Sequence, residues 1–219
     1  MEELIRETLR YLGAGEKAPD ALRRQVTAVA EELTAAVRPR WTYRVFSLER
    51  TAEGIRLAGT DFLLPGKTAE RMLAQCGQAA LFACTLGAEF DARLRSSQAR
   101  DMAGAVILDA CGSAWVEQGC DRAEREIAGR FPGMYLTDRF SPGYGDLPLS
   151  LQPAFCALLD VGRRLGVSVT DRFLMIPTKS VTAVAGLSDR PQMARIRGCE
   201  YCSMQTTCAL RKRGMRCAL

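Results

Sequence analysis

Histidine is absent from this chain of 219 residues. Catalysis by Ser–His–Asp or Cys–His groups is therefore excluded, because each needs an imidazole as its base. A metal ion held by histidine ligands is excluded for the same reason. Any chemistry must come from other side chains, from the backbone or from a bound molecule, and we name no general acid, general base or other catalytic residue.

Long apolar runs, a basic leader and a nucleic-acid-binding pattern are also missing. No run reaches the roughly 18 apolar residues that a membrane span needs. Met1–Leu4 is acidic, which predicts no secretory signal, and we expect a cytoplasmic protein without membrane contact. The net charge is +5, and arginine supplies 26 of the 30 basic residues. Because no basic stretch before the tail alternates with aromatic residues, nucleic acid is not predicted as a partner.

What is present is ordinary globular composition, 47% hydrophobic and 25% charged. Long helices mixed with strands that do not alternate with them favour an α+β fold with an antiparallel sheet. We expect a helical segment over 1–40, a core over 41–190 and a tail over 191–219. The predicted helices cover residues 3–12, 20–37, 65–75, 101–130 and 151–165, with a short one from 86. The predicted strands cover 41–48, 55–57, 62–64, 78–85, 135–140, 167–170, 173–176 and 181–185.

Nine cysteines fall into two groups. In a cytosolic chain they do not suggest disulfides. The first group is scattered among apolar residues and predicts small core side chains: Cys76, Cys84, Cys111, Cys120 and Cys156. The long helix over 101–130 is also rich in small residues, which predicts tight packing; close approach to a ligand is the alternative.

The second cysteine group has the spacing C-x2-C-x5-C-x8-C, at Cys199, Cys202, Cys208 and Cys217. A Cys-x-x-Cys turn lets two thiolates bind one metal, and two more cysteines complete fourfold coordination. Surrounding arginines would lower the thiol pKa and balance the thiolate charge. The tail therefore predicts an iron–sulfur cluster or structural zinc, the alternative being uncoordinated thiols in a reducing compartment.

The stretch Arg139-Phe-Ser-Pro-Gly-Tyr144 is the most informative in the chain. Pro142-Gly143 predicts a type II turn, since proline presets φ and glycine accepts the positive φ that this turn needs. Arg139 can hold a carboxylate by paired charge-assisted hydrogen bonds, and Tyr144 offers a ring edge and a hydroxyl. The bend is therefore suited to a small zwitterionic ligand. The alternative is a surface arginine and a core tyrosine on an ordinary turn.

The same stretch resembles the Arg-x-x-Pro-Gly-Tyr motif of the C-terminal activation (reactivation) domain of vitamin B12-dependent methionine synthase. Thr170–Thr182 resembles the second recognisable segment of that domain, an extended stretch ending in Ser-Val-Thr. Phe82–Gly87 and the helix around Asp109–Ser113 look like the free-standing relatives, in which the domain is a separate chain. The resemblance covers roughly residues 40–187.

The resemblance implies a single α+β domain with a curved, mainly antiparallel sheet and flanking helices. It also implies S-adenosylmethionine (AdoMet) binding at Arg139, Pro142, Gly143 and Tyr144. In the synthase, cobalamin oxidised to cob(II)alamin is restored by an electron from a flavoprotein and a methyl group from AdoMet. This chain would then be a component of a methyltransferase, acting in trans on a corrinoid-binding methionine synthase or related methyltransferase, with a flavoprotein or ferredoxin as electron donor.

One position departs from the family pattern. The synthase domain has an acidic residue six positions before the motif arginine, where this chain has Gly133. Asp138 is close in sequence, but adjacent residues of a strand face opposite ways, so it is not an obvious replacement. Asp146, after the bend, is the candidate replacement anion for the ligand ammonium.

Two other functions remain open on the sequence. The chain could bind and cap a different corrinoid protein without turnover. It could also be a small iron–sulfur electron carrier, in which case the cysteine tail would be the primary site.

Overall fold

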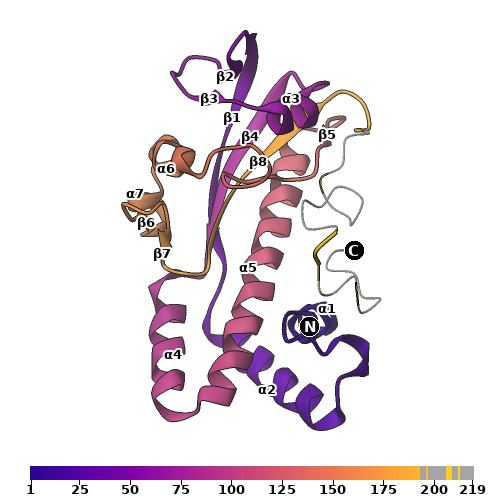
Figure 1. Ribbon diagram of the computed structural model, residues 1–219, viewed down its shortest axis with the longest axis vertical. Helices are drawn as coiled ribbons and strands as arrows, with labels where there is room; N and C mark the ends of the chain where they lie inside the picture. Colours follow the sequence, from indigo (N-terminus) through magenta and orange to yellow (C-terminus); the bar gives the residue numbers. More distant parts are fainter. Residues whose placement is uncertain (193–195, 197–205, 209–211, 213–219) are drawn as a thin grey trace. The chain divides into compact units, whose positions relative to one another are not determined.

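The computed structural model describes residues 1–192, 196, 206–208 and 212, and Figure 1 shows its elements. These residues group into two compact units. The first unit contains residues 1–42, 83–123 and 160–181; the second contains 43–82, 124–159 and the described residues from 182 onward. The predicted division at residues 40 and 190 is a different one and stays a prediction.

The strands confirm an α+β fold with a mainly antiparallel sheet. The six-stranded sheet has the order β3-β2-β1-β4-β8-β5, and the pairs β1–β2, β2–β3 and β5–β8 are antiparallel. A separate antiparallel pair is formed by β6 and β7. The strands are β1 (Arg40–Thr51), β2 (Gly54–Leu57), β3 (Leu63–Leu64), β4 (Gln78–Thr85), β5 (Tyr135–Leu136), β6 (Ser168–Val169), β7 (Met175–Ile176) and β8 (Ser180–Ser188).

Within the first unit, helices α1 (Glu2–Tyr11) and α2 (Asp20–Ala36) pack against each other. The buried side chains of α2 are Val26, Ala30 and Leu33, which recur at helical spacing as predicted. The chain becomes extended at Val37, two residues before Pro39, as expected for a helix that approaches a proline. The Trp115 indole N–H donates to the Val37 carbonyl at 2.9 Å and satisfies one group of this helix end.

The small residues of α5 (Met102–Arg130) serve packing in the first unit, as predicted. A Cβ added at Gly112 would collide with the ring of Phe90, which comes from α4 (Gly87–Arg100). A Cβ at Gly119 would lie 2.6 Å from both Cys84 Sγ and Pro39 Cβ. These glycines let neighbouring elements approach the helix closely, so the small-residue pattern needs no ligand to explain it.

The predicted helix over 151–165 is two helices, α6 (Gln152–Leu159) and α7 (Val161–Leu165). Asp160 adopts a left-handed conformation with φ 52°, which interrupts the right-handed helix at that residue. A single helix was therefore wrong here. Two short 3-10 helices lie at Gly15–Lys17 and Leu149–Leu151.

In the second unit, α3 (Lys67–Leu73) packs on β2 beside the β2–β3 pair. The predicted strand over 135–140 is shorter than expected, because only β5 forms a ladder with β8. Beyond it, Phe140 makes an isolated antiparallel bridge with Val184. Thr137 adds two bonds to Gly186, one from its backbone N–H and one to its hydroxyl oxygen.

The five scattered cysteines are buried and outside disulfides, so their prediction as core side chains is confirmed. Burial raises the pKa of the Cys76 and Cys111 thiols to about 11, which keeps them protonated at neutral pH. Across the described part of the chain, no helix combines the length and apolarity needed to span a bilayer.

Candidate functional site

The bend at Pro142-Gly143 is the type II turn that the sequence predicts. Tyr144 N–H donates to the Ser141 carbonyl at 3.0 Å, and Gly143 has φ +89°. Pro142 is buried and Gly143 is exposed. Gly143 N–H donates to the Leu147 carbonyl at 2.8 Å, which folds residues 141–147 into one compact loop.

The loop is fixed to β8 on the side of Arg139. Phe140 and Val184 exchange two backbone hydrogen bonds of 3.0 and 2.8 Å, and the Phe140 side chain is 2% exposed. Because Phe140 is buried and bonded to β8, the sheet fixes the position of the neighbouring Arg139 backbone, from which the guanidinium side chain extends. The chain next to the bend is therefore held by its bridge to β8, as a binding group requires.

On its other side the loop is fixed to the beginning of α3 by Asp146. The two carboxylate oxygens accept hydrogen bonds from the backbone N–H groups of Lys67 at 2.7 Å and Thr68 at 2.9 Å. Hydrogen bonds from the Thr68 side chain and from these N–H groups lower the pKa of Asp146 to about 2. Asp146 thus acts as a helix cap from a distant segment. Its predicted contact with a ligand ammonium stays a prediction.

Arg139 is paired with Glu124 of α5 inside the second unit. One guanidinium nitrogen lies 2.5 Å from a Glu124 carboxylate oxygen, and the side chains are 10% and 19% exposed. A largely buried guanidinium needs such a counterion. A ligand carboxylate that binds Arg139 must therefore share this guanidinium with Glu124.

Tyr144 and Asp138 both bond to the backbone of Ile196. The Tyr144 hydroxyl donates to the Ile196 carbonyl at 3.1 Å, and the Ile196 N–H donates to Asp138 Oδ2 at 3.0 Å. Tyr144 is 40% exposed, whereas Ile196 is 5% exposed. Asp138, just before Arg139, and Tyr144, at the end of the turn, are thus both bonded to Ile196, a residue distant from them in the sequence.

The other three segments that carry the family resemblance meet in the first unit. In the segment 170–182, the Lys179 ammonium lies 2.9 Å from Asp109 Oδ1 and 2.8 Å from Ser113 Oγ. Ser180 Oγ bonds to Thr85 Oγ1 at 2.8 Å. The Thr178 hydroxyl donates to Asp91 at 2.7 Å. This polar cluster fixes residues 178–180, where β8 begins.

Sequence reasoning missed several residues around the site. Glu124 was predicted only as part of the helix over 101–130, and Ile196 only as part of the tail over 191–219. Asp138 was set aside on the rule that adjacent strand residues face opposite ways, but β5 ends at Leu136, so the rule does not apply to it. No spacing signal connects Glu124 or Ile196 to the motif, since their separations from it are 15 and 52 residues.

Three of the four predicted metal ligands, Cys199, Cys202 and Cys217, lie outside the described residues. Cys208 is described, is partly exposed and is not in a disulfide. Among the described residues, no cluster of cysteine, aspartate and glutamate side chains could hold a metal ion. The metal site therefore stays a prediction.

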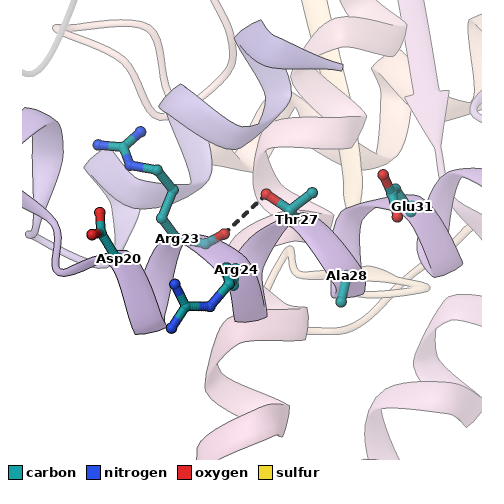
Figure 2. A pocket seen from close by; sticks show the side chains of 6 residues that line it. All are labelled: Asp20, Arg23, Arg24, Thr27, Ala28 and Glu31. Atoms are coloured by element: carbon teal, nitrogen blue, oxygen red, sulfur yellow. Dashed lines mark hydrogen bonds between the residues drawn. The ribbon is translucent and has the colours of Figure 1, made fainter.

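Figure 2 shows a pocket of about 410 Å³ on the surface of α2. Its described lining consists of Asp20, Arg23, Arg24, Thr27, Ala28 and Glu31. None of these is a predicted site residue, and none offers an aromatic face on which an adenine could stack. The pocket is therefore not assigned to the predicted ligand.

Comparisons with known proteins identify the fold. Models of known protein families give no match to this sequence, and neither do the curated proteins. Among solved structures, the chain matches the crystal structure of the MetH reactivation domain bound to AdoHcy. The TM-score is 0.60 at 16% identity, and the match covers 90% of this chain and 74% of that one. The chain therefore shares the fold of the MetH reactivation domain, as the motif resemblance predicts.

Proposed function

We propose that this chain binds AdoMet and supports the reductive reactivation of a corrinoid-dependent methionine synthase in trans. The partner would be that synthase or a related corrinoid methyltransferase, and a flavoprotein or ferredoxin would supply the electron. AdoMet carries its methyl group on a sulfonium, so the donor is already activated. This protein would contribute binding and orientation rather than an acid or a base.

The observation that carries the proposal is the bend itself. Pro142, Gly143 and Tyr144 lie on one ordered type II turn, and Arg139 lies two residues before it, in a chain with the fold of a domain solved with AdoHcy. Phe140 fixes the loop to β8 at one end, and Asp146 fixes it to α3 at the other. Such a doubly anchored loop suits a guanidinium that must be positioned before a ligand arrives.

A second candidate is a protein that caps a corrinoid protein without binding AdoMet. The pairing of Arg139 with Glu124 and of Tyr144 with Ile196 favours it, because both polar groups of the motif already have partners within the chain. Under this alternative the bend is a structural feature and the exposed Tyr144 ring contacts the partner.

Calorimetric titration of the full-length chain with AdoHcy separates the two candidates. If Arg139 binds the ligand carboxylate, Arg139→Ala weakens AdoHcy binding by about 10- to 100-fold, the value of a charge-assisted hydrogen bond. Arg139→Lys should fall between, since lysine keeps the charge but loses the paired geometry.

Arg95→Ala is the matched control, because Arg95 is an exposed arginine of α4 outside the motif. It removes the same charge and should leave AdoHcy affinity unchanged. Thermal unfolding of each variant shows whether loss of the Glu124 partner has unfolded the chain. No AdoHcy binding by the folded wild-type protein would contradict the AdoMet-binding function and favour the capping function.

Action in trans needs a second assay. Full-length protein is added to a methionine synthase that lacks its own reactivation domain and has been inactivated by oxidation. With AdoMet and a reducing system, methionine formation should return, and Arg139→Ala should reduce the recovery. Recovery that is independent of this chain would contradict the proposed role.

A further inference from the structure

Ile196 is held at the bend by both polar atoms of its backbone. Its N–H donates to Asp138 Oδ2 at 3.0 Å, and its carbonyl oxygen accepts from the Tyr144 hydroxyl at 3.1 Å. Ile196 is 5% exposed. It reaches the bend through tertiary contacts, because 52 positions separate it from Tyr144 in the sequence. A residue bonded in this way replaces water at one acceptor and one donor that belong to the motif region.

The two bonded atoms of Ile196 have the connectivity of an amino acid. Its nitrogen and carbonyl carbon are attached to one Cα, just as the ammonium and the carboxylate of AdoMet are attached to one carbon. A carboxylate accepts from the nitrogen, and a hydroxyl donates to the oxygen. These are the same partner types that an α-amino acid requires at its two charged ends.

We propose that Asp138 and Tyr144 form the subsite for the amino-acid end of AdoMet, and that the Ile196 backbone occupies this subsite when the ligand is absent. The inference rests on the proposed function and goes further, because it assigns Asp138 as the acceptor for the ligand ammonium. Ile196 is then an internal competitor that the ligand displaces. Because Ile196 belongs to the tail, its displacement links ligand binding at the bend to the tail.

Charge decides the competition between the two occupants. A peptide N–H is neutral, whereas the ligand ammonium is charged, and a charge-assisted hydrogen bond to a carboxylate is roughly twice as strong as a neutral one. The same holds for a carboxylate in place of the Ile196 carbonyl at Tyr144. Asp138 is also a candidate for the acid missing at Gly133, because its carboxylate accepts from the Ile196 N–H at the position proposed for the ligand ammonium.

Ile196→Pro tests the competition directly, since proline has no N–H to donate to Asp138. AdoHcy should bind this variant about tenfold more tightly than wild type, the equivalent of one lost competing hydrogen bond. Ile196→Val is the matched control, because it keeps the N–H and an apolar side chain and should bind as wild type does.

Methylthioadenosine serves as the control ligand, because it carries the adenosine and the sulfur but not the amino-acid end. Its affinity should be the same for wild type and Ile196→Pro. Asp138→Asn, which removes the negative charge, should weaken AdoHcy by about tenfold or more and leave methylthioadenosine unchanged. Equal shifts for the two ligands would overturn the subsite.

Amide hydrogen exchange at Ile196 provides a measurement without any substitution. The Ile196 N–H should be protected in the ligand-free protein and exchange faster on saturation with AdoHcy; protection that persists in the complex overturns the inference. If AdoHcy binds, depends on Arg139 and is indifferent to Ile196→Pro, only this inference fails. If AdoHcy binds neither wild type nor any variant, the proposed function fails with it.

Discussion

Asp146 accepts hydrogen bonds at both carboxylate oxygens, from the backbone N–H groups of Lys67 and Thr68. Gly66, just before these residues, has φ +93°, and a Cβ there would lie 2.8 Å from the Asp146 carboxyl carbon. The side chain of Asp146 can therefore reach the start of α3 only because residue 66 has no Cβ. The charge on Asp146 also matches the positive end of the helix dipole.

This contact predicts acid sensitivity. The pKa of Asp146 is about 2 in the folded protein, below the ordinary value of 3.8. A carboxylate with a lowered folded pKa stabilises the fold above its unfolded pKa, and that contribution disappears as the pH falls toward the folded pKa. Between about pH 4 and pH 2, wild type should therefore lose stability relative to Asp146→Asn, which cannot titrate at this position.

Urea unfolding of both proteins across this pH range measures the difference. The other carboxylates titrate in both proteins and cancel in the comparison. Wild type should be the more stable at pH 7, because asparagine retains only one acceptor oxygen for the two N–H groups. A constant difference between the two proteins from pH 7 to pH 2 would contradict the capping role.

At the scale of elements, the stretch 135–140 places Arg139 by running antiparallel to β8. The close approach depends on Gly186. A Cβ there would lie 2.5 Å from Cys76 Sγ, 2.7 Å from Leu73 Cδ2 and 3.1 Å from Thr137 Cγ2. Leu73 of α3, Cys76 in the loop after it and Thr137 just after β5 therefore surround one residue of β8 that has no side chain.

Gly186→Ala should destabilise the protein by about 1–3 kcal/mol, the usual cost of overpacking a core. Gly129→Ala is the control, because Gly129 lies in α5 with no atom within 4 Å of an added Cβ and should gain up to about 1 kcal/mol from better helix propensity. Chemical unfolding measures both variants. Equal stability of Gly186→Ala and wild type would mean that this contact can relax without cost.

Local signals explain which elements the sequence predicts well. The long helix α5 and the type II turn are determined by residues that are close in sequence, which is why a single sequence predicts them. The structure confirms both. The break at Asp160 carries no glycine or proline signal, and the helix there was predicted as continuous. Glu124, Asp138 and Ile196 reach the motif only through tertiary contacts, and a single sequence does not contain those distances.

At the scale of the whole molecule, two regions of the chain are predicted to bind other molecules. One is the motif bend, whose polar groups are already engaged within the second unit. The other is the cysteine- and arginine-rich tail over 191–219, whose cysteine spacing predicts a metal ion. Ile196 connects the bend to the cysteine tail along the chain, because it is bonded at the bend and lies three residues before Cys199.

The cysteine spacing gives a prediction for the complete protein. Protein purified without oxygen should contain stoichiometric iron with visible absorbance or, alternatively, one zinc ion. Cys202→Ser should remove most of this metal, because the Cys-x-x-Cys pair provides two of the four predicted ligands. Elemental analysis together with absorbance distinguishes iron from zinc.

Cys84→Ala is the control for this measurement. Cys84 is a buried core thiol near the Val116 carbonyl and is not a predicted ligand, so its loss should leave the metal content unchanged. If metal binding also changes AdoHcy affinity in wild type but not in Ile196→Pro, the tail acts on the bend through Ile196. Wild-type protein that contains neither iron nor zinc would instead make the tail cysteines ordinary thiols, and the bend would then be the remaining candidate site of the chain.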